Sequence, residues 1–101
     1  MGIISLSDTI DVPFPQRLFV AMADFAEARG EDAVVWGGIK QRFFDGGSFL
    51  DVQELNEDEL VTLRRTIACL IRYVEHHAEF AGFQTNGVLE SLTRIDKFLN
   101  N

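Results

Sequence analysis

The segment from Glu57 to Ala81 constrains the fold more than any other part of the chain, because apolar residues recur in it at steps of three and four. This spacing places apolar side chains on one face of an α-helix. Asn56 stands just before the segment and Glu59 three residues later, which is the pattern of a helix-starting capping box. At 1.5 Å per residue the helix would be about 37 Å long, enough to span a small domain. We therefore expect one long helix over 57–81, ended by Gly82, to form the spine of the fold.

Two shorter helices are expected on clear signals, one near the N-terminus and one after the long helix. Pro15 suits the first turn of a helix and Gly30 the position just past its end, so we predict a helix over 15–29. Apolar residues recur with helical spacing over 86–99, where Thr85 or Asn86 can serve as the cap. The connection from the long helix is short, which favours antiparallel packing of this last helix against it.

Residues 31–52 allow two interpretations. Asp32 can cap a helix over 32–44, although the glycine pair at 37–38 would weaken it by about 1 kcal/mol per glycine relative to alanine. The apolar face of that helix would carry Val35, Ile39 and Phe43, with Trp36 beside them. The alternative is a short hairpin within 33–52, because Asp-Gly between apolar pairs is a strong turn signal. We favour the helix, which gives a mainly α fold, a bundle of about four helices; the alternative is an α+β fold with that hairpin.

Residues 1–14 are predicted to form an extended N-terminal arm. Apolar residues occupy alternate positions, as in a strand, with Asp8 interrupting, and Pro13 and Pro15 then end the extended segment. The alternation suggests a short edge strand. No partner strand is evident nearby in the sequence, and the arm could instead add to another subunit. A chain of 101 residues is expected to form a single domain, 1–101.

The balance of charge limits the partners that this chain can have. It has 16 acidic and 9 basic residues and a formal net charge of −7. Nucleic acids and anionic membranes both attract clusters of Lys and Arg, so we expect neither direct nucleic-acid contact nor a membrane partner. No apolar run approaches the ~20 residues that cross a bilayer, and no signal peptide is evident. The single cysteine, Cys69, fits a reducing cytoplasm.

Much of the acidity lies in one segment, residues 45–59, within a stretch from Arg42 to Arg64 that has no Lys or Arg inside it. The acidic residues at 57–59 fall in the first turn of the long helix, where each carboxylate stabilises the positive end of the helix dipole by about 0.3–1 kcal/mol. Asp45, Asp51 and Glu54 have no such local role. The functional prediction therefore centres on these three, which stand beside apolar residues.

We predict that this acidic segment binds a basic protein. The predicted contact residues are five carboxylates and three apolar anchors: Asp45, Asp51, Glu54, Glu57, Asp58, Phe44, Phe49 and Trp36. A nucleic-acid-handling protein such as a nuclease is the natural partner class, because its phosphate-binding groove is basic. The predicted function is a non-enzymatic interaction module: an inhibitor, an immunity protein or an adaptor, a profile that phage-encoded inhibitors of bacterial defence nucleases would share.

Two alternative functions remain open at the level of the sequence. One is a self-associating structural or regulatory helical protein, a homodimer in which the N-terminal arm or the long helix pairs across a two-fold axis. The other is a small metal-binding protein that uses Glu75, His76 and Glu79, although zinc commonly takes three or four protein ligands and this cluster supplies two or three at most. No spacing indicates a nucleophile or a general base, so we expect no enzyme activity and no cofactor.

Cys69 and the nearby arginines form one further cluster on the predicted long helix. Arg65 and Arg72 lie about one turn before and after Cys69, and nearby cations are what activates a thiol. A small, inert side chain is nevertheless the more common role of a cysteine in such a setting. Arg64 and Arg65 have no carboxylate three or four residues away, so they must find partners elsewhere in the fold or stay solvated.

Overall fold

The computed structural model describes residues 2–76 and 80–100. Within these residues the elements follow in the order β1 (Ile3–Ser7), β2 (Ile10–Pro13), α1 (Gln16–Ala28), α2 (Ala33–Asp45), β3 (Phe49–Asp51), α3 (Glu57–Tyr73) and α4 (Thr85–Leu99). Two short 3₁₀ turns, η1 (Val52–Glu54) and η2 (Val74–His76), follow β3 and α3. The fold is mostly helical but includes a small sheet, so α+β describes it as well as a helical bundle does.

The N-terminal segment is a β-hairpin and not a single extended arm, which corrects the prediction. β1 pairs antiparallel with β2, with Ile4 opposite Val12 and the turn at Asp8–Thr9. On its other edge β1 pairs in parallel with β3, where Ile4 lies opposite Leu50, and the sheet order is β2-β1-β3. The residues on this line across the sheet, Ile4, Val12 and Leu50, are all buried. Because β1 is paired on both edges within the chain, it is not free to add to another subunit.

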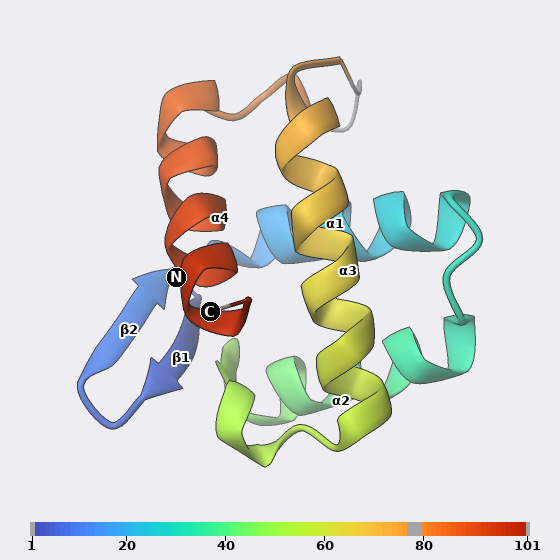
Figure 1. Ribbon diagram of the computed structural model, residues 1–101, viewed down its shortest axis with the longest axis vertical. Helices are drawn as coiled ribbons and strands as arrows, with labels where there is room; N and C mark the ends of the chain where they lie inside the picture. The colour runs from blue at the N-terminus through green and yellow to red at the C-terminus, as the bar shows by residue number, and fades with distance from the viewer. Residues whose placement is uncertain (1, 77–79, 101) are drawn as a thin grey trace.

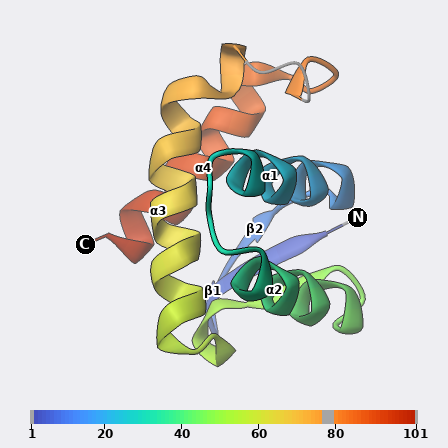
Figure 2. The same cartoon turned by 90° about the vertical axis from the view of Figure 1, so that its right-hand side faces the viewer.

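The four helices are arranged as two antiparallel pairs that cross. α4 runs back beside α3, as the short connection predicted (Figure 1). α1 and α2 also run in opposite directions, and Figure 2 shows them nearly end-on beside α3, which passes across both. The hydrophobic core lies where the two pairs and the sheet meet.

Aromatic rings form the centre of this core. Phe19 of α1 stacks on Phe43 of α2 with the ring centroids 4.0 Å apart. The edges of Phe14 and Trp36 meet the Phe19 ring at centroid distances of 6.3 and 6.2 Å. All four side chains are fully buried, and each aromatic pair adds about 0.5–1.5 kcal/mol to the contribution of burial itself. Phe19 therefore joins the hairpin, α1 and α2 at one point.

The helix predicted over 32–44 is confirmed as α2, but Trp36 rather than Val35 lies on its buried face. The Asp32 carboxylate accepts hydrogen bonds from the backbone N–H groups of Val34 and Val35 at 2.8 and 3.3 Å, and caps α2 as expected. The hairpin proposed within 33–52 is wrong, because only β3 is extended there and its partner is β1. The buried face of α2 consists of Trp36, Ile39 and Phe43.

α3 begins where the sequence predicted. The Asn56 side chain accepts a hydrogen bond from the Glu59 backbone N–H at 2.8 Å, and the Glu59 carboxylate accepts one from the Asn56 N–H at 2.9 Å. This reciprocal pair is the capping box. The α-helical part ends earlier than predicted, at Tyr73, and continues as the 3₁₀ turn η2. Residues 77–79 of the predicted helix lie outside the described residues.

The other predicted helices differ from the structure mainly at their ends. The helix expected over 15–29 is α1, with Pro15 at its cap position. The helix expected over 86–99 is α4, which begins one residue earlier. Thr85 is its first residue and Gln84 occupies the cap position without a side-chain hydrogen bond, so the prediction of Thr85 or Asn86 as the cap is wrong.

The two glycines of α2 differ in what a side chain would contact. A Cβ added to Gly37 would have no heavy atom within 4 Å, whereas one added to Gly38 would lie 2.9 Å from a carboxylate oxygen of Glu59. That carboxylate is held by the Arg42 side chain and by the backbone N–H of Asn56, so it cannot move away freely. Glycine at 38 therefore allows the close approach of α2 to α3.

We expect Gly37→Ala to raise the free energy of unfolding by about 0.5–1 kcal/mol, because alanine is the better helix former at an exposed position. Gly38→Ala gains the same propensity but displaces the Glu59 carboxylate, so its stability should fall below that of Gly37→Ala. Urea unfolding of the two variants measures the difference. Equal gains would show that Glu59 does not restrict position 38.

Candidate functional site

The segment that joins α2 to α3 forms a groove on the protein surface. Its lining consists of Arg42, Asp45, Gly46, Phe49, Asp51 and Glu54, from the end of α2, β3 and η1. The groove has a volume of about 350 Å³. A groove of this size suits one or two side chains of a partner molecule.

A tight turn after α2 brings the parts of this groove together. The backbone N–H of Ser48 donates to the carbonyl oxygen of Phe43 at 2.9 Å, which ends the helix, and Gly47 and Ser48 have φ values of 72° and 67°. Both residues lie in the left-handed region that is common just past helix ends. A Cβ added to Gly46 would lie 2.5 Å from the carbonyl oxygen of Phe49. Glycine at 46 therefore lets the chain return close to the end of α2.

Arg42 brings a positive charge to the groove, but a buried carboxylate already balances it. Its Nε atom donates to the two carboxylate oxygens of Glu59 at 3.0 and 3.1 Å. Glu59 is only 6% exposed, so the pair is oriented from inside the protein. The remaining charged residues of the lining are Asp45, Asp51 and Glu54, and no Lys or Arg in the described part of the chain forms an ion pair with them. The groove therefore presents excess negative charge.

Asp51 has a structural role that the sequence did not reveal. Its carboxylate accepts a hydrogen bond from the backbone N–H of Gln53 at 2.9 Å and caps η1. Asparagine at this position would keep an acceptor oxygen while removing the charge. A charge reversal would remove the cap as well, so Asp51→Asn is the substitution that isolates the charge.

The structure brings four of the eight predicted contact residues into one groove: Asp45, Phe49, Asp51 and Glu54. Phe49 is 39% exposed and gives the groove an apolar surface. Glu57 and Asp58 are exposed on the first turn of α3 but do not line the groove. Phe44 also lies outside the lining; it is 40% exposed, and its ring meets the Phe43 ring edge-on at a centroid distance of 5.4 Å.

Trp36 is not available as a surface anchor, and that part of the prediction is wrong. Its side chain is fully buried on the inner face of α2, against Phe19. Trp36 precedes Ile39 by three residues and Phe43 by seven, so helical geometry places all three on one face. The sequence predicted Val35 on this face with Trp36 beside it, whereas in the structure Trp36 packs against Phe19 of α1 and is buried, and Val35 is only partly buried.

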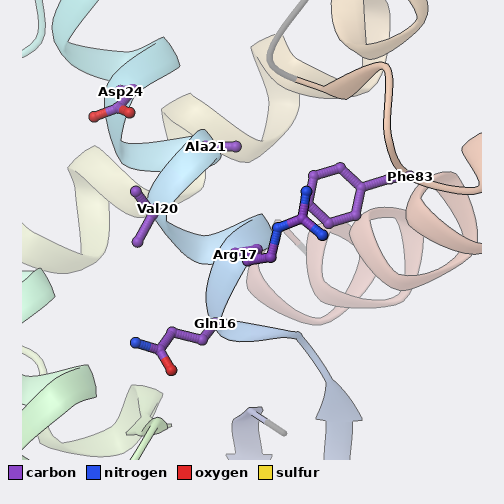
Figure 3. A pocket seen from close by; sticks show the side chains of 6 residues that line it. All are labelled: Gln16, Arg17, Val20, Ala21, Asp24 and Phe83. Atoms are coloured by element: carbon purple, nitrogen blue, oxygen red, sulfur yellow. The ribbon is translucent and has the colours of Figure 1, made fainter.

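A larger hollow lies on another part of the surface, between α1 and the segment that precedes α4 (Figure 3). It has a volume of about 550 Å³ and is lined by Gln16, Arg17, Val20, Ala21, Asp24 and Phe83. The guanidinium carbon of Arg17 lies 5.4 Å from the centroid of the Phe83 ring, a cation–π contact. Its lining has one cation, Arg17, and one carboxylate, Asp24, and these two side chains do not point toward each other. No sequence motif includes the residues of this hollow.

The structure describes two of the three residues named in the metal-binding alternative. Glu75 and His76 are exposed in η2, and Glu79 lies outside the described residues. In residues 2–76 and 80–100, no three His, Cys, Asp or Glu side chains are grouped so that they could hold a metal ion.

Comparisons with known proteins do not assign this chain to a protein family. No family model, no curated protein and no solved structure matches it significantly. Among the described residues, no helix has both the length and the apolar character needed to cross a membrane. The geometry of the acidic groove is therefore the basis of the functional proposal.

Proposed function

We propose that this protein is a non-enzymatic interaction module that works in the cytoplasm and binds a basic protein through the groove between α2 and η1. The observation that carries the proposal is that Asp45, Asp51 and Glu54 line one groove together with the exposed Phe49. An arginine side chain of a partner matches this surface, because guanidinium groups hydrogen-bond carboxylates in a fork and pack against aromatic rings. Lysine would be bound by charge and by contact of its apolar stem.

The chemistry of the groove also suggests the class of partner. Proteins that handle nucleic acids carry basic grooves that bind phosphates, and an acidic protein is steered towards such a surface. We propose an inhibitor, immunity protein or adaptor that occupies the basic surface of such a protein, for example a nuclease. Phage-encoded inhibitors of bacterial defence nucleases would fit this profile.

The proposal predicts that a short arginine-rich peptide binds the groove. Asp45→Asn, Asp51→Asn and Glu54→Gln together remove three negative charges and change the net charge from −7 to −4. Exposed ion pairs contribute about 0.2–1 kcal/mol each, so the triple variant should lose about 0.6–3 kcal/mol of binding free energy. We expect binding about tenfold weaker at low salt, which corresponds to 1.4 kcal/mol, measured by calorimetry.

A matched control separates the groove from the charge of the whole protein. Asp8→Asn, Asp11→Asn and Glu90→Gln also give a net charge of −4, and all three residues are exposed outside the groove. This control variant should bind the peptide nearly as well as the wild type. If it loses as much affinity as the groove variant, the peptide responds to net charge alone and the proposed site is wrong.

A further inference from the structure

A second pocket, between α1 and α3, has the opposite chemistry to the acidic groove. It has a volume of about 220 Å³ and is lined by Phe25, Ala26, Arg29, Glu31, Arg65, Thr66 and Cys69. Two guanidinium groups, a hydroxyl and a thiol thus meet at one small pocket of a protein whose net charge is −7. This pocket shares no lining residue with the acidic groove.

Aromatic rings hold Arg29 in place at this pocket. Its guanidinium carbon lies 4.9 Å from the ring centroid of Tyr73 and 5.5 Å from that of Phe25. Within residues 2–76 and 80–100, no carboxylate forms an ion pair with Arg29. An oxyanion could therefore bind the Arg29 guanidinium without first displacing a described carboxylate, and the rings reduce the side-chain entropy lost on binding.

Arg65 and Glu31 form the other charged part of the pocket. The Nε and Nη2 atoms of Arg65 donate to the two Glu31 carboxylate oxygens at 2.7 and 2.6 Å. The hydrogen bond to Glu31, and then the charge of Glu31, raise the pKa of Arg65 further above its already high ordinary value. The pair cancels the negative charge of Glu31 and leaves three of the five guanidinium N–H donors of Arg65 for other contacts. Arg29 then gives the pocket a net positive charge.

Thr66 supplies the observation that points to a ligand. Its side chain is 2% exposed, and its hydroxyl oxygen has no hydrogen-bond partner among the residues that the structure describes. Leaving such a buried group without a partner costs about 1–3 kcal/mol. Thr66 lines the pocket but its hydroxyl oxygen has almost no exposed surface, so a small side-chain movement on binding would let a ligand oxygen accept its hydrogen bond and remove that cost.

We propose that this pocket binds the oxyanion group of a small molecule, a phosphate or a carboxylate. Arg29 would supply charge-assisted hydrogen bonds in the fork geometry that both groups accept, and the Thr66 hydroxyl would donate from the buried side. Pockets for drug-sized ligands measure about 300–1,000 Å³, so this pocket fits an anionic group and a few attached atoms. The proposal does not depend on the function proposed for the acidic groove.

Cys69 provides a direct test, because it is the single cysteine of the chain, is partly exposed and lines the pocket. The rate of its alkylation by iodoacetamide is measured while inorganic phosphate or acetate replaces chloride at constant ionic strength. At about nine times the Kd only one tenth of the pockets are free, so alkylation should be about tenfold slower. Protection by phosphate, by acetate or by both supports the proposal and distinguishes the two sources of the oxyanion.

Two variants show whether protection comes from this pocket. Thr66→Val removes the hydroxyl with little change in volume, and Arg29→Gln removes the charge; both should abolish the saturable protection. Arg94→Gln is the control, since Arg94 is exposed on α4 and does not line the pocket. Circular dichroism establishes that each variant is folded. The proposal is overturned if neither anion protects the wild type more than chloride, or if protection is unchanged in both pocket variants.

Discussion

Replacing Phe19 with alanine is expected to lower the free energy of unfolding by about 3–5 kcal/mol, the usual cost of removing a buried phenylalanine side chain. Phe19 is fully buried, stacks on Phe43 at 4.0 Å and meets the edges of two further rings. Those rings come from the end of the hairpin and from α2, so little of the cavity can be closed by a local shift. Domains of this size are stable by about 5–15 kcal/mol, and the variant would lose a large part of that total.

Urea unfolding followed by circular dichroism measures this loss, and the fluorescence of Trp36, the single tryptophan, provides a second probe inside the core. Val20→Ala is the control, because Val20 is the next residue of α1 and is 38% exposed. Substitutions at such surface positions usually change stability by no more than about 0.5 kcal/mol. A loss below about 1 kcal/mol for Phe19→Ala would contradict the packing at the centre of the core.

Glu59→Ala is expected to lower the free energy of unfolding by about 2–4 kcal/mol, because the Glu59 carboxylate makes two separate interactions. It completes the capping box at the start of α3, and losing a cap costs about 1 kcal/mol. It also receives the Arg42 guanidinium, and removing one partner of a buried pair costs about 3–5 kcal/mol. The second cost is smaller here, since the Arg42 side chain is 40% exposed and water can solvate it.

Glu57→Ala is the matched control for this substitution. Glu57 lies in the same helical turn and has the same charge, but it is exposed, so its loss removes only the interaction with the helix dipole, worth about 0.3–1 kcal/mol. Urea unfolding should therefore separate the two variants by at least about 1 kcal/mol. Equal costs would contradict the role of the buried pair.

Glu59→Ala should also weaken peptide binding, because Arg42 then adds an unbalanced positive charge to the groove.

Features set by neighbouring residues were predictable from the sequence. The Asn56–Glu59 capping box and the Asp32 cap each satisfy backbone N–H groups within one helical turn, so the local sequence contains the whole interaction. The end of α3 was not predictable in this way. Val74 continues the apolar spacing of α3 and is buried, so periodicity does not distinguish the 3₁₀ turn from the α-helix.

Features set by distant residues were missed. The parallel pairing of β1 with β3 joins segments about 45 residues apart, and no local pattern specifies it. The hairpin turn at Asp8–Thr9 contains no Asn-Gly or Asp-Gly pair, so the alternating pattern by itself predicts one extended arm. The burial of Trp36 likewise depends on Phe19, which belongs to another helix.

The candidate groove was predictable in composition but not in arrangement. The run of acidic residues in the sequence identified Asp45, Asp51 and Glu54, but the turn at 46–48 and β3 are what place them in one groove with Phe49. The pocket between α1 and α3 was not foreseen as a site. Arg29 and Thr66 are far apart in the sequence, and only the packing of the two helices brings them together.

The most direct test of the central proposal is to map the contact surface of the arginine-rich peptide on the isotope-labelled protein by NMR. The largest amide shifts are expected at residues 45–54, weakening as salt is added because the contacts are exposed ion pairs. They should disappear in the variant that carries Asp45→Asn, Asp51→Asn and Glu54→Gln. Shifts spread over all acidic residues, including Asp8 and Glu90, or centred away from residues 45–54, would contradict the proposal that this groove is the binding site.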